Sequence, residues 1–322
     1  MRSDPASITF KEWLGNQDAL QIHNYFPAVS LENLDAIAKS GMPVTRVVHN
    51  YRKTCLAGNH YRKNKECFKC SSGSYFSGIV RGCYNSSKIM SSYISVYSQA
   101  IEKFESKIKI EYIAISPLIR EYLIECGISK DKISVIPNST PRENSISERA
   151  TDCIFVGRIE EEKGIFKLID VWRNHSELPM LHIVGGGTRT KQLEEAITNL
   201  NNVYFHGLRY GDELASINHN SKVAIFPALW KEPFGRVVVE AMSRGQALAC
   251  SKNLTQLDAI DDQSNGQYFD LTDDDMFEKI SKCLMFDSKR QIRISTEKWL
   301  ASYSPNSVAN LWLEYYKNLE KS

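Results

Sequence analysis

The sequence predicts an α/β protein with two lobes, each built around a parallel sheet. The chain has 322 residues, whereas one domain usually takes about 100–200. Short apolar runs alternate with amphipathic helical patterns along most of the length, which is typical of parallel sheets covered on both faces. A polar, turn-rich segment, PNSTPRENSISERAT (137–151), interrupts this alternation and predicts a linker between the lobes.

The apolar runs and helical patterns fix the expected elements. Runs of four to seven mostly apolar residues predict strands that are buried on both faces. These strands are expected at 19–24, 43–49, 110–116, 132–138, 153–157, 180–185, 202–207, 223–228 and 246–251. Helices are expected at about 30–40, 86–107, 117–126, 164–174, 189–199, 212–219 and 234–244, and again in an aromatic-rich tail, 273–320.

Three parts of the chain follow from this pattern. We expect residues 1–140 to form a partial N-terminal Rossmann-like lobe and residues 150–300 to form a second lobe. Residues 301–322 form a C-terminal helix that packs back on the first lobe. The aromatic side chains of the tail, which include Trp299 and Trp312, are expected to serve packing and not to bind a cofactor.

Composition and charge exclude several classes of protein. A hydrophobic fraction of 42% with 24% charged residues is typical of an ordered globular protein. A net charge of +2 argues against a nucleic-acid-binding protein. The charge is uneven, since residues 1–140 carry 18 basic and 12 acidic residues and the rest carry 22 and 26. The basic first lobe therefore predicts an anionic partner.

The sequence also indicates a compartment. No run approaches the ~18 apolar residues of a membrane span, and the first residues lack the apolar core of a signal peptide. We therefore expect a cytoplasmic protein, with contact to the inner face of the membrane as a peripheral option. Its eight cysteines are then expected to be thiols or metal ligands and not disulfides.

The segment AIFPALWKEPFGRVVVEAMSRG (224–245) predicts the principal site. It combines a strand, a loop with Pro233 and Gly235, and a helix that begins near Phe234. Helix N–H groups at such a point can hold a phosphate or a sugar edge. Glu232 precedes the helix and Glu240 lies inside it, so two carboxylates can accept hydrogen bonds from hydroxyls of one ligand. The alternative is that both glutamates are surface charges.

Two further strand-to-helix turns are expected at the same edge. After a strand that ends at Gly157, Arg158 and Lys163 can bind phosphate oxygens. The alternative is a surface salt bridge with the acidic run 160–162. Gly185, Gly186 and Gly187 follow another strand and permit close approach of a ligand. They lack the G-x-G-x-x-G spacing of a dinucleotide site.

These motifs, in this order, resemble the retaining family 4 glycosyltransferases of the GT-B fold, also called glycosyl transferases group 1. The resemblance rests on FVGRIEEEKG, LHIVGGG, NVYFHGLRY and FPALWKEPFGRVVVEAMSRGQALACS in the second lobe. IHNYFPAVS, VVHNYRKTC and AISPLIREYLIECGISKDKISVIPN carry it in the first. It implies two Rossmann-like lobes that face each other across a cleft, with the acceptor on the side of residues 1–140 and a nucleotide-sugar donor held mainly by residues 150–300.

The resemblance also implies roles for single residues. Arg158 and Lys163 would bind the donor diphosphate, Glu232 the sugar hydroxyls and Glu240 the ribose. The backbone N–H groups of Phe234 and Gly235 would contact the sugar, and Gly157, Gly185 and Gly186 would lie along the donor. His49 would lie beside the transferring sugar carbon, whereas the role of His23 is left open. No metal or cofactor is required in the family. His49, Arg158, Lys163 and Glu232 are the expected catalytic group.

The activity implied is transfer of a hexosyl-type sugar to an acceptor hydroxyl with retention, in bacterial surface polysaccharide or lipopolysaccharide assembly. The acceptor would be a glycan or a lipid-linked molecule. Compared with the family, the first lobe is expected to be shortened by its first strand and glycine-rich loop. The main alternative is therefore an inactive protein that binds a nucleotide-sugar or a partner. A GT-B epimerase or phosphorylase fits less well.

The first lobe carries a basic, cysteine-rich loop. Seven basic residues and one acidic residue lie between Arg46 and Lys69, which predicts either a solvated loop or contact with an anionic acceptor such as a lipid diphosphate. The same region contains four cysteines whose spacing allows a structural zinc site, although four unlinked thiols are the favoured interpretation. These are Cys55, Cys67, Cys70 and Cys83.

Overall fold

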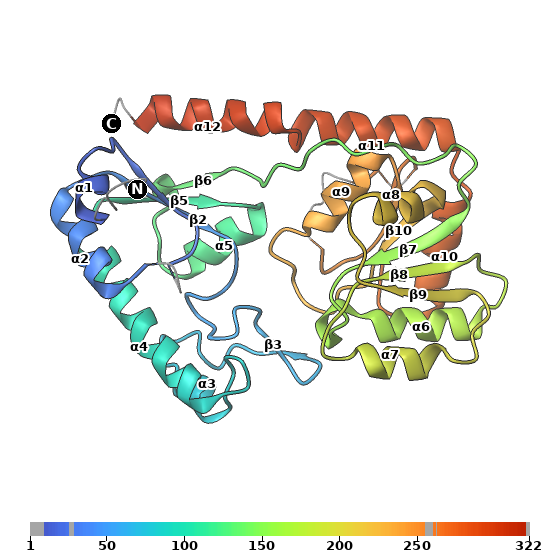
Figure 1. Ribbon diagram of the computed structural model, residues 1–322, viewed down its shortest axis with the longest axis horizontal. Helices are drawn as coiled ribbons and strands as arrows, with labels where there is room; N and C mark the ends of the chain where they lie inside the picture. The colour runs from blue at the N-terminus through green and yellow to red at the C-terminus, as the bar shows by residue number, and fades with distance from the viewer. Residues whose placement is uncertain (1–9, 26–28, 255–259, 262, 320–322) are drawn as a thin grey trace, which may run out of the picture. The chain divides into compact units, whose positions relative to one another are not determined.

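The computed structural model describes residues 10–25, 29–254, 260–261 and 263–319 (Figure 1). The chain forms two compact units. The first unit ends at Ile136 and the second begins at Pro137; a short hairpin, Tyr61–Glu66, is grouped with the second unit. The C-terminal helix expected at 301–322 is α12 (Pro305–Leu319), whereas 301–302 end the preceding helix and 320–322 lie outside the described residues.

The first unit is an α/β unit with a parallel sheet. Its strands run in the order β1-β2-β5-β6, and every pair is parallel. In the described part of the chain, β1 therefore lies at one edge of this sheet. The elements are α1 (Phe10–Leu14), β1 (Leu20–Ile22), α2 (Leu31–Ser40), β2 (Val44–Val48), α3 (Phe76–Val80), α4 (Lys88–Glu105), β5 (Ile110–Ala114), α5 (Pro117–Glu125), η1 (Lys130–Lys132) and β6 (Ile133–Val135).

Local sequence signals explain where these helices begin. Side chains of Ser30, Ser87 and Ser116 cap α2, α4 and α5 by accepting a hydrogen bond from a backbone N–H three residues on. Pro117 then occupies the first turn of α5, where its missing N–H costs nothing. Helix α2 ends at Gly41, which adopts the left-handed conformation with φ 67°.

The second unit is larger and has a six-stranded sheet. Its elements are the hairpin β3 (Tyr61–Arg62) and β4 (Lys65–Glu66), β7 (Asp152–Val156), η2 (Glu161–Lys163), α6 (Ile165–Asn174), β8 (Leu181–Val184), α7 (Thr190–Ile197), β9 (Val203–Gly207), α8 (Gly211–Asn220), β10 (Ser221–Phe226), α9 (Arg236–Arg244), β11 (Ala247–Ser251), β12 (Gly266–Phe269), α10 (Asp273–Leu284), α11 (Ser288–Ser302) and α12 (Pro305–Leu319). The six strands β7 to β12 are all parallel, in the order β12-β11-β10-β7-β8-β9.

Helices cover both faces of this sheet, as Figure 1 shows for α6 and α7 on one side and α8 and α9 on the other. The main core lies between the strands and α6, α7 and α10, where Trp172, Leu181 and Phe269 are almost completely buried. Every residue of β10 and β11 is buried. Continuous apolar strands of this kind are the feature that predicted parallel sheets, and that prediction is confirmed.

Several details differ from the sequence-based expectation. Strand β12 and the short helices α1 and α3 were not predicted, and the tail forms three helices. The segment 137–151, predicted as a linker, is fixed to the second unit by specific contacts. Thr140 is completely buried and accepts a hydrogen bond from Trp299 Nε1 at 2.9 Å, while Arg244 Nη1 donates to Glu143 at 2.7 Å. Within the described ranges, no helix is long and apolar enough to span a membrane.

Candidate functional site

The strand order of the second unit creates a crevice at one point. From β7 the chain moves outward through β8 and β9, and it then returns to place β10 on the other side of β7. The loops after β7 and β10 therefore leave in opposite directions, and ligands of open α/β sheets bind outside the strand ends at such a point. A cavity of about 230 Å³ lies there, between Gly157, Arg158 and Lys163 from one loop and Glu232 and Gly235 from the other.

Lys163 and Glu232 form an enclosed ion pair in this cavity. The Lys163 Nζ lies 2.8 Å from Oε1 and 2.7 Å from Oε2 of Glu232, and each side chain is only 17% exposed. The same ammonium lies 5.5 Å from the centre of the Trp230 ring, which attracts a cation by its π face. Because little water screens it, the pair can present both a cation and a carboxylate to one polar ligand.

Arg158 also lies at the cavity but is far more open to solvent. Its side chain is 62% exposed, and its Nη2 donates to Oε1 of Glu162 at 2.8 Å. This contact is the local salt bridge that the sequence allowed as the alternative. An exposed pair four residues apart is worth only a few tenths of a kcal/mol, so the guanidinium can exchange Glu162 for a phosphate at little cost.

Helix α9 begins at the cavity, at Arg236, two residues after the predicted start near Phe234. Gly235 adopts the left-handed conformation with φ 68°, which ends the preceding loop and prevents an earlier helix start. No side chain caps this helix, so its first N–H groups are suited to a polar ligand. The ring of Phe234 is buried and packs edge-on against Tyr303 at 6.0 Å. Phe234 can therefore contribute only its backbone.

Glu240 lies one turn into α9. Its Oε1 accepts a hydrogen bond from Arg236 Nε at 3.0 Å, and Arg236 itself lines the cavity. Burial raises the pKa of Glu240, although the nearby cations Arg244 and Arg236 oppose that effect. The carboxylate is thus partly desolvated, which favours hydrogen bonds from ligand hydroxyls over bonds from water.

Glycines bring the loops of this site together. A Cβ at Gly164 would lie 1.8 Å from the carbonyl oxygen of Pro227, and a Cβ at Gly185 would lie 1.8 Å from that of Gly157. Gly186 packs against the Leu208 side chain. The close approach that the glycine run predicted is thus made, in this structure, to neighbouring loops of the same unit. Gly185 and Gly186 do not line the cavity, but Gly185 supports Gly157, which does.

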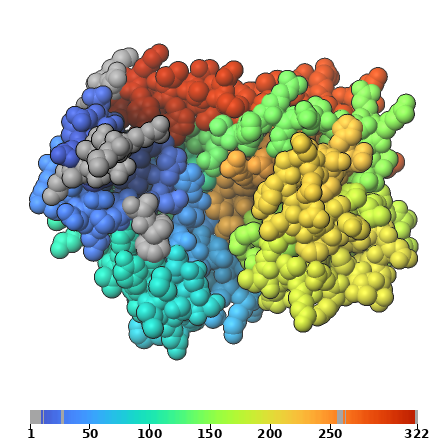
Figure 2. Space-filling model, viewed as in Figure 1, coloured from blue at the N-terminus to red at the C-terminus, as the bar shows by residue number. Residues whose placement is uncertain are grey.

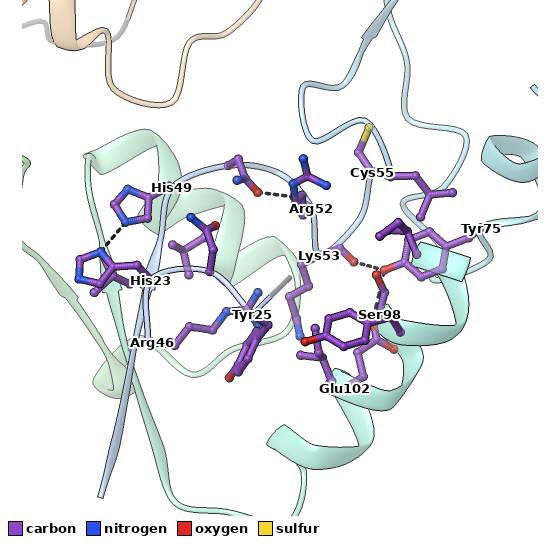
Figure 3. Close-up of a pocket in the computed structure, with 18 residues that line it drawn as sticks. His23, Tyr25, Arg46, His49, Arg52, Lys53, Cys55, Tyr75, Ser98 and Glu102 are labelled. Carbon is purple, nitrogen blue, oxygen red and sulfur yellow. Dashed lines mark hydrogen bonds between the residues drawn. The ribbon is translucent and has the colours of Figure 1, made fainter. Parts of the chain in front are cut away.

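The first unit contains a second cavity, of about 60 Å³, near the ends of β1 and β2 (Figure 3). His23 and His49 lie together at one side of it, with His23 Nδ1 2.9 Å from His49 Nε2 and the rings stacked at 5.1 Å. The amide of Gln21 contacts the other nitrogen of His23 at 2.8 Å. Burial, and then the charge of His23, lowers the pKa of His49 to about 4. His49 is therefore neutral at physiological pH.

Two of the seven basic residues between Arg46 and Lys69 both line this cavity and pair with one acidic residue. Arg46 forms an ion pair with the buried carboxylate of Glu105, and Lys53 Nζ lies 3.3 Å from the same group. Hydroxyls of Tyr25 and Tyr112 donate to Glu105 at 3.1 and 3.2 Å. Glu105 thus pairs with both Arg46 and Lys53, and its single negative charge compensates one of these two positive charges. Glu105 was missed because it lies 59 residues from Arg46 and gives no local signal.

The four cysteines of the same region are thiols in the structure, like the other four in the chain. Burial raises the pKa of the Cys70 thiol. Among the residues that the structure describes, no group of three or more His, Cys, Asp or Glu side chains is arranged to hold a metal ion.

A family model and several curated relatives match the chain. The model of the glycosyl transferases group 1 matches residues 138–298, which is half of the chain. A lipopolysaccharide 1,2-N-acetylglucosaminetransferase of Salmonella typhimurium is 25% identical over 215 residues, which cover 58% of this chain and 56% of the relative. An uncharacterised glycosyltransferase of Methanocaldococcus jannaschii, MJ1607, is 28% identical over 170 residues, or 50% and 40% of the two chains. The chain thus spans only about half the length of these relatives.

Solved structures share the fold over nearly the whole chain. The lipopolysaccharide outer core galactosyltransferase WaaB superposes with a TM-score of 0.64 and 18% identity, covering 96% of this chain and 78% of that one. HepE of Anabaena, solved in complex with UDP and glucose, superposes with a TM-score of 0.67 and 16% identity. The match covers 95% of this chain and 79% of the HepE chain. This likeness confirms the GT-B fold class that the sequence predicted.

Proposed function

Because the chain belongs to the glycosyl transferases group 1 family, we propose that it transfers a sugar from a nucleotide-sugar donor to an acceptor hydroxyl, with retention at the anomeric carbon. The observation that carries this proposal is the cavity at the switch point of the second unit. It places the Lys163–Glu232 pair, the exposed guanidinium of Arg158 and the uncapped start of α9 around one space.

The donor diphosphate is assigned to Lys163 and Arg158. Two of the three N–H bonds of the Lys163 ammonium can be directed at Glu232, which leaves the third for a phosphate oxygen. Arg158 can exchange its exposed contact with Glu162 for a bidentate bond to phosphate. These cations, with the N–H groups at the start of α9, would stabilise the negative charge that develops as the diphosphate leaves.

The sugar and the nucleoside are assigned to the carboxylates. Glu232 would accept hydrogen bonds from sugar hydroxyls while Lys163 keeps it ionised, and the backbone of Phe234 and Gly235 would contact the same sugar. Glu240 would accept from the ribose hydroxyls, because its partly buried carboxylate gains more from such bonds than an exposed one does. Solved structures of HepE, which shares the fold, contain UDP, UDP and glucose, or UDP-glucose.

The reaction proceeds, in this proposal, without a protein nucleophile. Glu232 is held by Lys163 and is better explained as a hydroxyl acceptor. The departing diphosphate can take the proton of the acceptor hydroxyl, so that the new bond forms on the face from which the leaving group departs. His49, neutral because burial lowers its pKa to about 4, would contact the transferring sugar as a hydrogen-bonding group.

The acceptor is proposed to be a glycan or a lipid-linked molecule used in surface polysaccharide or lipopolysaccharide assembly. The support is that one curated relative and one solved structure with this fold carry lipopolysaccharide glycosyltransferase names.

A panel of UDP-, GDP- and dTDP-sugars tests the proposal by thermal shift and calorimetry. We expect one base to raise the melting temperature, since a ligand at 100 times its Kd stabilises a protein by about 2.7 kcal/mol. Acceptor-dependent release of the nucleoside diphosphate then tests catalysis. Binding without any turnover would favour the alternative, an inactive nucleotide-sugar-binding protein. The absence of binding to every donor would contradict the proposal itself.

A further inference from the structure

The first unit exposes large apolar side chains on two adjacent helices. These residues are Phe76 (72% exposed) and Val80 (50%) on α3, and Ile89 (83%), Tyr93 (56%) and Val96 (65%) on α4. We call them the α3–α4 apolar face. Helices α3 and α4 pack against each other, and Figure 2 shows their teal atoms at the surface of the molecule. Soluble proteins seldom expose so many large apolar groups on neighbouring elements unless a partner covers them.

The spacing explains why these residues share a side. On α4, positions 89, 93 and 96 follow the i, i+4, i+7 pattern of one helical stripe, and on α3 positions 76 and 80 are four apart. Another stripe of α4, with Ile94 and Tyr97, is buried in the unit. Helix α4 is therefore apolar both toward its own core and toward solvent, and only the first of these is explained by the fold.

Gly78 sets the position of α3. A Cβ at Gly78 would lie 2.9 Å from Leu56 Cδ1 and 3.3 Å from Cys70 Sγ. The glycine thus lets the short helix press its inner side onto the small core of Leu56, Cys70, Tyr75 and Ile94. Phe76 and Val80 are then left on the outer side.

The stretch of chain that carries this face, residues 67–101, has charges of one sign. Residues 67–101 contain no aspartate or glutamate, and their three basic residues, Lys69, Arg81 and Lys88, are all exposed. A second copy of the chain would bring two positive faces together, which is unfavourable. A surface with a negative outer layer and an apolar interior satisfies both the cations and the apolar side chains.

We propose that the α3–α4 apolar face docks the protein onto an anionic lipid bilayer, with the apolar side chains inserted at the headgroup level and the basic residues against the lipid phosphates. This inference deepens the proposed function, because it rests on the lipid-linked acceptor assigned above and would bring the chain to the surface where such an acceptor lies. Lipid binding itself requires no sugar, so it can be tested separately.

The experiment is flotation of the full chain with phosphatidylcholine vesicles that contain or lack phosphatidylglycerol. We expect binding to the anionic vesicles that weakens as salt is raised, with little binding to the neutral ones. The double variant Ile89→Glu/Val96→Glu should bind at least tenfold more weakly. Lys88→Glu should weaken binding about fivefold or more, given the contribution of one basic residue near such a surface. Met285→Glu is the matched control, since Met285 is 84% exposed but lies in the second unit, and it should bind like the wild type.

Three results would overturn the inference. They are equal binding to neutral and anionic vesicles, unchanged binding of the double variant, or a dimer of the wild-type chain that the double variant abolishes. Nucleotide-sugar affinity, measured on the same preparations, separates the two proposals. Vesicle binding by a protein that binds no nucleotide-sugar would contradict only the proposed function. Nucleotide-sugar binding by a protein that binds no vesicles would contradict only this inference.

Discussion

Lys163 and Glu232 bind each other across the cavity of the second unit, although they lie 69 residues apart in the chain. Lys163 ends η2 after β7, and Glu232 precedes α9 after β10. The two strands are neighbours in the sheet, so their following loops meet at its carboxyl edge. The pair therefore joins the two halves of the sheet at the point where the strand order reverses, and it defines the centre of the proposed donor site.

Glu240→Ala should weaken donor binding and leave the fold intact. The proposed hydrogen bonds from ribose hydroxyls to this carboxylate are charged, and the loss of one costs about 1.5–3 kcal/mol, which is roughly ten- to a hundredfold in Kd. Calorimetry with the donor identified in the panel measures the effect. Glu195→Ala provides a control, because Glu195 is an exposed residue of α7. Equal donor affinity in a folded Glu240→Ala variant would remove the ribose assignment.

Gly164→Ala should destabilise the second unit more than an ordinary glycine replacement does. Gly164 has φ 74°, and an added Cβ would lie 1.8 Å from the Pro227 carbonyl oxygen. Gly211 also has a positive φ, 52°, but no atom lies within 4 Å of its added Cβ. The free energy of unfolding of Gly211→Ala should thus fall only by the cost of holding a residue with a Cβ in the left-handed conformation, about 1–2 kcal/mol.

Urea unfolding compares the two glycine variants directly. The difference between their free energies of unfolding isolates the contact between the loops after β7 and β10. Because that contact shapes the cavity, Gly164→Ala should also reduce nucleotide-sugar affinity, whereas Gly211→Ala should not. If both variants lose the same stability and keep the same affinity, the close approach at Gly164 has no role in the site.

His49 should remain neutral until the pH falls to about 4, because burial and the charge of His23 lower its pKa. In the unfolded chain its pKa is near the ordinary value of 6.5, so the unfolded state takes up the proton first on acidification. The free energy of unfolding that the neutral His49 contributes is therefore fully present above about pH 6.5. It is lost progressively as the pH falls toward about 4 and does not change further below that.

NMR titration of the His49 ring measures this pKa. His23→Phe removes the neighbouring charge but keeps an aromatic ring beside His49. Since burial is the larger cause, we expect the pKa of His49 to rise in this variant and still stay below 6.5. A wild-type pKa near 6.5 would show that neither burial nor His23 holds the His49 ring neutral.

The sequence predicted most of this fold, and particular elements show why some parts escaped. Strands such as β10 and β11 are continuous apolar runs and were found. Strand β12 has only four residues, beginning Gly266-Gln267, and gives no such signal. The segment 137–151 is polar in composition, yet its position depends on partners such as Trp299 and Arg244 that lie more than 90 residues away. Local composition cannot reveal such contacts.

The residues of the candidate site also fall into those that the sequence predicted and those that it did not. Arg158, Lys163, Glu232, Gly235 and Glu240 were named in advance because each lies in a strand–loop–helix segment with its own signal. The pairing of Lys163 with Glu232 depends on the order of strands, which the sequence does not state. Trp230 and Arg236 were missed as parts of the site, although both belong to the quoted segment 224–245, because their roles arise only from contacts with Lys163 and Glu240.

The most direct test of the account is the kinetics of nucleoside diphosphate release by Arg158→Ala and Lys163→Ala. If these cations stabilise the departing diphosphate, each substitution should lower kcat more than it raises KM, because the interaction strengthens as charge develops. Loss of one such group typically costs about 10²–10³ in kcat. Lys167→Ala, at an exposed position of α6, should leave both constants unchanged. Near wild-type kcat in the Arg158→Ala/Lys163→Ala double variant would contradict the central claim that this cavity holds and activates the donor.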